Sequence, residues 1–163
     1  MLLRERDLDD VAFARLAARL APALPRDAVL SVHTRVEVAA ALGAGLHLAE
    51  AAPAPGPGGP WHGRSVHDGT AVERARSQGA TYLVAGTLFS TAGKSGRAPA
   101  GPQGLRSMCA AAGSVPVYAI GGIDAGRVDV ARDAGARGVA VVGAILEADD
   151  PEGAASALLR ALD

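Results

Sequence analysis

Val115-Pro-Val-Tyr-Ala-Ile-Gly-Gly-Ile123 is an apolar strand that ends on a pair of glycines. Gly138-Val-Ala-Val-Val-Gly-Ala-Ile145 repeats this arrangement after one intervening helical segment. Strands that are apolar throughout are typical of a parallel sheet that helices cover. The two segments therefore predict consecutive strands of an α/β fold.

The rest of the chain continues this alternation of short apolar runs and helical patterns. Asp9 or Asp10, Asp68 and Asp124 are expected to cap helices. Because crossovers between parallel strands are right-handed, the pattern leaves an open doubly wound sheet or a closed (β/α) barrel of the TIM-barrel type. Strands are expected at 28–33, 45–48, 62–67, 81–86, 115–120 and 138–142, and helices at 9–21, 35–42, 68–78, 102–112, 124–134 and 151–162.

The strand count bears on the choice of a barrel. Such a barrel has eight strands, and six are counted here after the first helix. Arg4-Glu-Arg-Asp7 resembles the tail of one more strand. The barrel interpretation therefore treats residues 1–163 as a single domain that lacks about one and a half β/α units at its front, namely the first strand, the first helix and most of the second strand.

Composition limits the partners of the protein. The chain has 163 residues, with 16 basic and 17 acidic side chains and a net charge of −1. This balance creates no field that would attract nucleic acid or an anionic membrane, so neither is expected as a partner. No apolar run approaches the roughly 20 residues of a membrane span, and Cys109 is the single cysteine, which excludes an internal disulfide. These features predict a cytoplasmic protein.

The two glycine turns are the strongest candidates for a binding site. Parallel β/α folds place their sites at the carboxyl ends of the strands. Gly121 and Gly122 follow one strand, and Val142, Gly143 and Ala144 follow the next. Glycines allow backbone N–H groups and helix dipoles to approach an anion. The glycines could serve only to turn the chain, but two such turns on consecutive strands predict a site for a small phosphorylated ligand.

Other polar residues follow other strands. The loop after residues 81–86 contains Ser90, Thr91 and Lys94, which could cover an anionic ligand or simply face solvent. Arg4 and Arg6 alternate at a strand end, so both could point inward and bind phosphate, or both could be surface charge.

The histidines are spread over three strands. His33, His47 and His67 could converge, but no carboxylate is placed beside them for a metal site or a catalytic triad. His47 and His62 are expected to be packed or hydrogen-bonded structural residues.

From Leu3 to Ile145 the chain resembles the thiamin phosphate synthase and TenI superfamily. The segments that carry the resemblance are Arg35-Val-Glu-Val-Ala-Ala-Ala-Leu-Gly-Ala-Gly-Leu-His-Leu48, Ser65-Val-His67, Phe89-Ser-Thr-Ala-Gly-Lys94, Ala119-Ile-Gly-Gly-Ile123 and Gly138-Val-Ala-Val-Val-Gly-Ala-Ile145. The resemblance implies a β/α barrel that handles thiazole phosphate in thiamin biosynthesis. In the synthase branch, a pyrimidine pyrophosphate ionises and the thiazole nitrogen captures the carbocation, with Mg²⁺ and cationic side chains holding the pyrophosphate.

The resemblance also implies roles for individual positions. The basic pyrophosphate positions match Arg4, Arg6 and Lys94, the hydroxyl positions match Ser65 and Thr91, and the thiazole phosphate turns match Gly121, Gly122 and Gly143.

Several positions depart from the family pattern. The two metal-ligand aspartates align with Thr34 and Ala52, so no metal cofactor is expected. The tautomerase histidine of the TenI branch aligns with Thr87, which leaves His33, Glu50 and His67 as candidate bases.

These departures favour a TenI-like protein that binds a thiazole phosphate, as a diverged tautomerase or a ligand-binding protein. The alternatives are an active thiamin phosphate synthase and a non-catalytic regulatory or structural phosphate-binding domain. A homodimer is expected, because an open barrel edge invites pairing with another chain.

Overall fold

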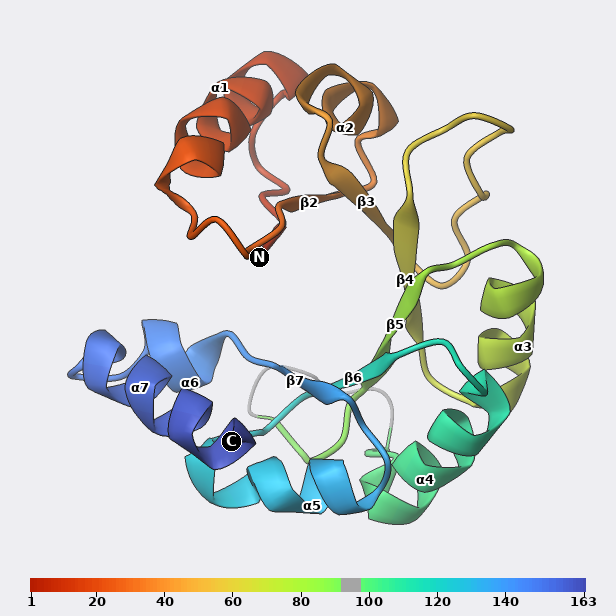
Figure 1. Ribbon diagram of the computed structural model, residues 1–163, viewed down its shortest axis with the longest axis vertical. Helices are drawn as coiled ribbons and strands as arrows, with labels where there is room; N and C mark the ends of the chain where they lie inside the picture. The colour runs from red at the N-terminus through yellow and green to blue at the C-terminus, as the bar shows by residue number, and fades with distance from the viewer. Residues whose placement is uncertain (92–97) are drawn as a thin grey trace.

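Parallel strands form a single curled sheet in the computed structural model, which describes residues 1–91 and 98–163. The sheet follows chain order from β1 to β7, and each strand runs parallel to its neighbours. Helices cover its outer side, as in a TIM-type barrel that is open between β1 and β7 (Figure 1). The strands are β1 (Leu2–Leu3), β2 (Ser31–His33), β3 (Gly45–Leu48), β4 (His62–Val66), β5 (Tyr82–Gly86), β6 (Val117–Ile120) and β7 (Gly138–Ala140).

The barrel interpretation is confirmed, and the open doubly wound sheet is not formed. The helices are α1 (Asp10–Leu20), α2 (Val36–Leu42), α3 (Gly69–Ser77), α4 (Gly101–Ala112), α5 (Val128–Asp133), α6 (Gly143–Leu146) and α7 (Pro151–Leu162), with 3₁₀ turns η1 (Ala21–Ala23) and η2 (Ala125–Arg127). Among the described residues, no helix has both the length and the apolar character needed to cross a membrane.

Local sequence explains where most helices begin and end. Asp9 accepts a hydrogen bond from the N–H of Ala12 and caps α1, and Asp68 caps α3 through the N–H of Ala71. Gly43 ends α2 in the left-handed region at φ +61°, where glycine carries no Cβ penalty.

The expected helix at 124–134 is wrong in its first turn. Asp124 makes no capping bond, and η2 precedes the shorter helix α5. Gly126 lies within η2 and favours this departure, because glycine is a poor helix former.

Two apolar clusters lie between the sheet and its helices. The larger one packs α3, α4, α5 and α7 against the second half of the sheet, with Leu83, Leu105 and Val128 at its centre. The smaller one packs α1 and α2 against β1–β3 around Phe13 and Leu46, both fully buried. Both halves of the sheet thus have a core, which fixes the strand ends on which the candidate site depends.

Candidate functional site

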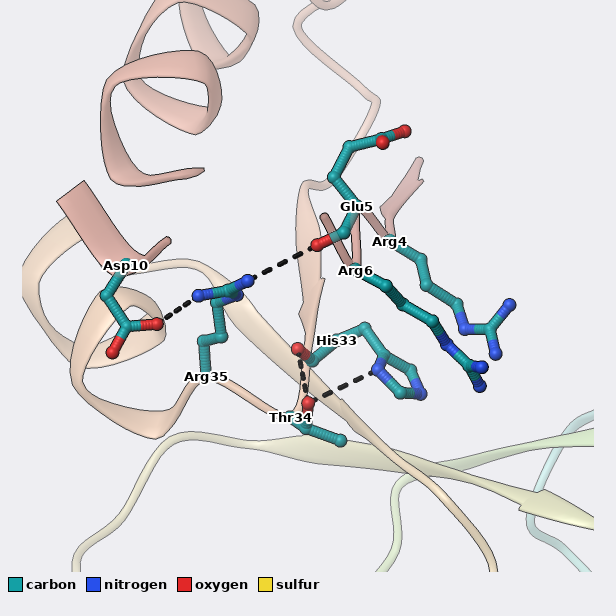
Figure 2. Close-up of a pocket in the computed structure, with 7 residues that line it drawn as sticks. All are labelled: Arg4, Glu5, Arg6, Asp10, His33, Thr34 and Arg35. Atoms are coloured by element: carbon teal, nitrogen blue, oxygen red, sulfur yellow. Dashed lines mark hydrogen bonds and ion pairs between the residues drawn. The ribbon is translucent and has the colours of Figure 1, made fainter. Parts of the chain in front are cut away.

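A cavity of about 350 Å³ opens where β1 and β2 end. Figure 2 shows the side chains of Arg4 and Arg6 extending in the same direction past His33. Within the described residues neither arginine makes an ion pair, so both guanidinium groups can bind an anion. The cavity is lined by Arg4, Glu5, Arg6, Asp10, His33, Thr34 and Arg35.

Arg35 shapes this cavity but is already engaged. Its guanidinium pairs with Asp10, donates to the carbonyl oxygen of Leu8 at 2.6 Å, and lies 4.3 Å from the centre of the Phe13 ring. It therefore joins α1 to the loop after β2. This role could not be predicted from local sequence, because the partners lie at least 22 positions away and meet Arg35 only in the folded chain.

His33 is the candidate base nearest to the two arginines. Burial lowers the pKa of His33, and the positive charges of Arg4 and Arg6 lower it further. Its neighbour Thr34 sits at φ +58° and donates its hydroxyl to the His33 carbonyl at 2.8 Å. At neutral pH the site thus presents a neutral imidazole beside two permanent cations.

The other candidate bases form a separate pair at the ends of β3 and β4. Nδ1 of His67 lies 2.5 Å from Oε2 of Glu50, and Arg74 of α3 lies 3.7 Å from the same carboxylate. His33 instead lies beside His47, with 6.1 Å between ring centres. The structure therefore brings His33 and His47 together, and it gives His67 a carboxylate partner that the sequence pattern did not place.

His47 and His62 are buried, as expected. His47 is hydrogen-bonded to Tyr82 and Ser65, which confirms its structural packing. His62 has one ring nitrogen, Nε2, with no partner among the described residues.

The first glycine turn follows β6. Gly121 and Gly122 have φ values of +106° and +65°, in the left-handed region. A Cβ on Gly122 would lie 2.8 Å from Cβ of Phe89, so this position has no room for a side chain. The N–H of Phe89 donates to the carbonyl of Gly121 at 3.0 Å and extends β5 along the turn.

The second turn lies on the neighbouring strand at the same edge. The register Ile120↔Ala140 aligns the ends of β6 and β7, so Gly121–Gly122 and Val142–Ala144 are adjacent. Helix α6 begins within this turn at Gly143 and has only four residues, so the prediction depends on backbone amides rather than on a helix dipole. Anion binding by the two turns stays a prediction.

The remaining predicted positions lie in different environments. Ser65 is half-buried, and its hydroxyl lies 2.9 Å from Nε2 of His47. The hydroxyl oxygen of Thr91 is buried and has no hydrogen-bond partner in the described part of the chain, and its role in ligand binding stays a prediction. Lys94 lies outside the described residues.

The positions of the family's metal ligands do not fit a Mg²⁺ site. Thr34 offers only a hydroxyl, and the carbonyl of Ala52 accepts a hydrogen bond of 2.5 Å from the buried guanidinium of Arg64. Mg²⁺ is bound through carboxylate and water oxygens, and a neighbouring cation opposes it. No group of three or more His, Cys, Asp or Glu side chains that could hold a metal occurs in residues 1–91 and 98–163.

Comparison with known proteins gives consistent matches. The family model described as thiamine monophosphate synthase matches residues 1–145. A thiamine-phosphate synthase of Deinococcus radiodurans is 41% identical over 158 residues, which is 92% of this chain and 56% of that protein. A thiamine-phosphate synthase of Thermus thermophilus is 46% identical over 100 residues, covering 61% of this chain and 48% of that protein. The chain spans about half the length of these two relatives.

A solved structure extends the likeness to the whole sheet. Thiamine phosphate pyrophosphorylase from Pyrococcus furiosus superposes with a TM-score of 0.83 at 27% identity, covering 99% of this chain and 81% of that one. Its fold therefore includes nearly every element described above.

Proposed function

The chain belongs to the thiamine monophosphate synthase family, and we propose that its barrel mouth joins a pyrimidine pyrophosphate to a thiazole phosphate to form thiamin phosphate. The observation that carries this proposal is the pair of guanidinium groups of Arg4 and Arg6 at the cavity beside His33, which form no ion pair in the described part of the chain. The relatives that are 41% and 46% identical bear the name thiamine-phosphate synthase, which favours this activity over the TenI-like one.

The arginines act on the leaving group. When the bond between the pyrimidine methylene carbon and the pyrophosphate oxygen breaks, both electrons leave with the pyrophosphate. Arg4 and Arg6 stabilise that growing negative charge through charge-assisted hydrogen bonds. The lone pair of the thiazole nitrogen then forms the new C–N bond, which gives a thiazolium product and free pyrophosphate.

The glycine turns at the ends of β6 and β7 hold the second substrate. Amide groups at Gly122, Gly143 and Ala144 are suited to the thiazole phosphate, because small residues let the backbone approach its oxygens. The hydroxyl of Thr91, which has no partner among residues 1–91 and 98–163, supports this placement, since the loop that contains it follows β5, the neighbour of β6. No step of this scheme is assigned to a metal ion.

A second candidate is a thiazole phosphate-binding protein without synthase activity. Thr34 and Ala52 favour it, because neither supplies the carboxylate that the family pattern has at these positions. This candidate retains the phosphate turns and uses His33 or the Glu50–His67 pair as a tautomerase base.

One assay separates the two candidates. The protein is mixed with both substrates, with and without Mg²⁺, and thiamin phosphate is measured by chromatography. The synthase proposal predicts product that disappears in the Arg4→Gln and Arg6→Gln variants. If no product forms at millimolar Mg²⁺ while thiazole phosphate still binds, the synthase proposal fails and the second candidate replaces it.

A homodimer is a further part of the proposal. Within the described residues β1 and β7 have no partner on their outer edges, and exposed apolar side chains lie on β1 (Leu2), just after β7 (Val142) and at the end of α6 (Leu146). Free edges and exposed apolar groups promote association. Light scattering is expected to give the mass of a dimer and Leu146→Glu to weaken it, whereas a monomer at every concentration would contradict this proposal.

A further inference from the structure

A chain of hydrogen bonds crosses the inner face of the sheet from β2 to β5. Tyr82 donates its hydroxyl to Oγ of Ser31 at 3.3 Å, and its oxygen lies 3.1 Å from Nδ1 of His47. Nε2 of His47 lies 2.9 Å from Oγ of Ser65. These groups connect β2, β3, β4 and β5.

Gly63 makes this chain possible. It lies on β4 between His47 and Tyr82, which are its register partners on the two neighbouring strands. A Cβ on Gly63 would lie 2.1 Å from Cζ of Tyr82, so the tyrosine ring occupies the space that a side chain would fill. The ring can therefore cross a strand and reach His47.

The direction of each proton follows from the partners. Tyr82 has one O–H, which goes to Ser31, so its oxygen accepts from Nδ1–H of His47. A neutral imidazole protonated on Nδ1 has its lone pair on Nε2. Ser65 must therefore donate its proton to His47, which leaves only acceptor positions on its oxygen.

The protonation states required by this assignment hold at neutral pH. The pKa of His47 is lowered to about 4, chiefly by burial and to a smaller extent by His33, Arg4 and Arg64. Burial, the largest influence, raises the pKa of the Tyr82 hydroxyl, which keeps it protonated at neutral pH.

We propose that Tyr82 and His47 are positioning residues, which fix the Ser65 hydroxyl so that its oxygen accepts a hydrogen bond from an N–H or O–H group of the bound ligand. Ser65 is half-buried and lies one residue before the carboxyl end of β4, at the edge of the sheet where parallel β/α folds bind their ligands. The identity of the ligand rests on the proposed function, whereas the proton arrangement in the Tyr82–His47–Ser65 chain does not.

The proton arrangement is tested by NMR on protein labelled with ¹⁵N histidine at pH 7. The expected result is a His47 ring protonated on Nδ1, with Nε2 unprotonated. Tyr82→Phe removes the acceptor and is expected to shift this ring toward the Nε2–H form. Tyr118→Phe, which alters a ring packed edge-on against Tyr82 at 6.2 Å, is the control and should leave the tautomer unchanged. A wild-type ring protonated on Nε2 overturns the inference.

The ligand contact is tested by calorimetric titration with the hydroxymethylpyrimidine pyrophosphate. Loss of one neutral hydrogen bond weakens binding about five-fold, so this loss is expected for Ser65→Ala and for Tyr82→Phe. In the double variant the second change should add nothing, because both act through the same hydroxyl. Additive losses overturn the inference. Absence of binding to every variant and to the unmodified protein refutes the proposed function instead, while the tautomer measurement still decides the proton arrangement.

Discussion

Acidification is expected to destabilise the protein through His47. The side chain is 1% exposed and its pKa falls to about 4, whereas the unfolded chain has the ordinary value of about 6.5. Between these two pH values the His47 imidazole is protonated in the unfolded state and neutral in the folded state. His47 therefore lowers the stability as the pH falls from 6.5 toward 4, and it adds no pH dependence above that window.

The expected size of the effect follows from the two pKa values. Moving from pH 7 to pH 5 is expected to reduce the unfolding free energy by about 2 kcal/mol through His47 alone. Urea denaturation at both pH values measures this loss. His47→Gln should remove the His47 share of the stability loss between pH 7 and pH 5, even though the substitution itself lowers the unfolding free energy at pH 7.

A matched control separates titration from packing. Leu46 is fully buried on the same strand, so Leu46→Ala lowers stability at both pH values but leaves their difference unchanged. The account of His47 is refuted if His47→Gln loses as much stability between pH 7 and pH 5 as the unmodified protein does.

Three further predictions concern the turns and the buried arginine. Thiazole phosphate at about 100 times its dissociation constant should stabilise the protein by about 2.7 kcal/mol in a thermal shift assay, and Gly143→Asp should abolish this gain by placing a second carboxylate where Glu147 already lies 3.1 Å from the Cβ position. Gly122→Ala should cost about 3 kcal/mol in urea denaturation from left-handed strain and the contact with Phe89, whereas Gly69→Ala, whose Cβ meets nothing within 4 Å, should change stability by less than about 0.5 kcal/mol. Arg64→Met should cost about 3 kcal/mol in the same assay, because three hydrogen bonds from the buried guanidinium to the carbonyls of residues 49, 50 and 52 are lost; an unchanged midpoint would show that these bonds contribute nothing.

The sequence predicted the sheet well, because apolar runs and glycine turns are local features. The parallel order and the turns at Gly121 and Gly143 follow from strands that are apolar throughout and end on glycine. The position of Arg4 and Arg6 just after β1 was also predictable from their alternation. The short helix α6 was missed, since four residues leave too little periodicity to recognise.

The polar interior could not be predicted in the same way. Contact between Tyr82 and His47 depends on the missing side chain of Gly63, and only the register across three strands reveals it. Arg64 is fully buried on the outer side of β4, although arginine is usually exposed. Its three carbonyl partners belong to a Pro/Gly-rich loop without periodicity, so no local pattern indicated them.

Calorimetric titration with inorganic pyrophosphate determines whether Arg4 and Arg6 form the binding site for a pyrophosphate group. We expect saturable binding, weakened about tenfold by Arg4→Gln or by Arg6→Gln through loss of a charged hydrogen bond. Arg19→Gln, which changes an exposed arginine at the end of α1, should leave the affinity unchanged. Equal affinity in all four proteins, or no binding to the unmodified one, would contradict the account.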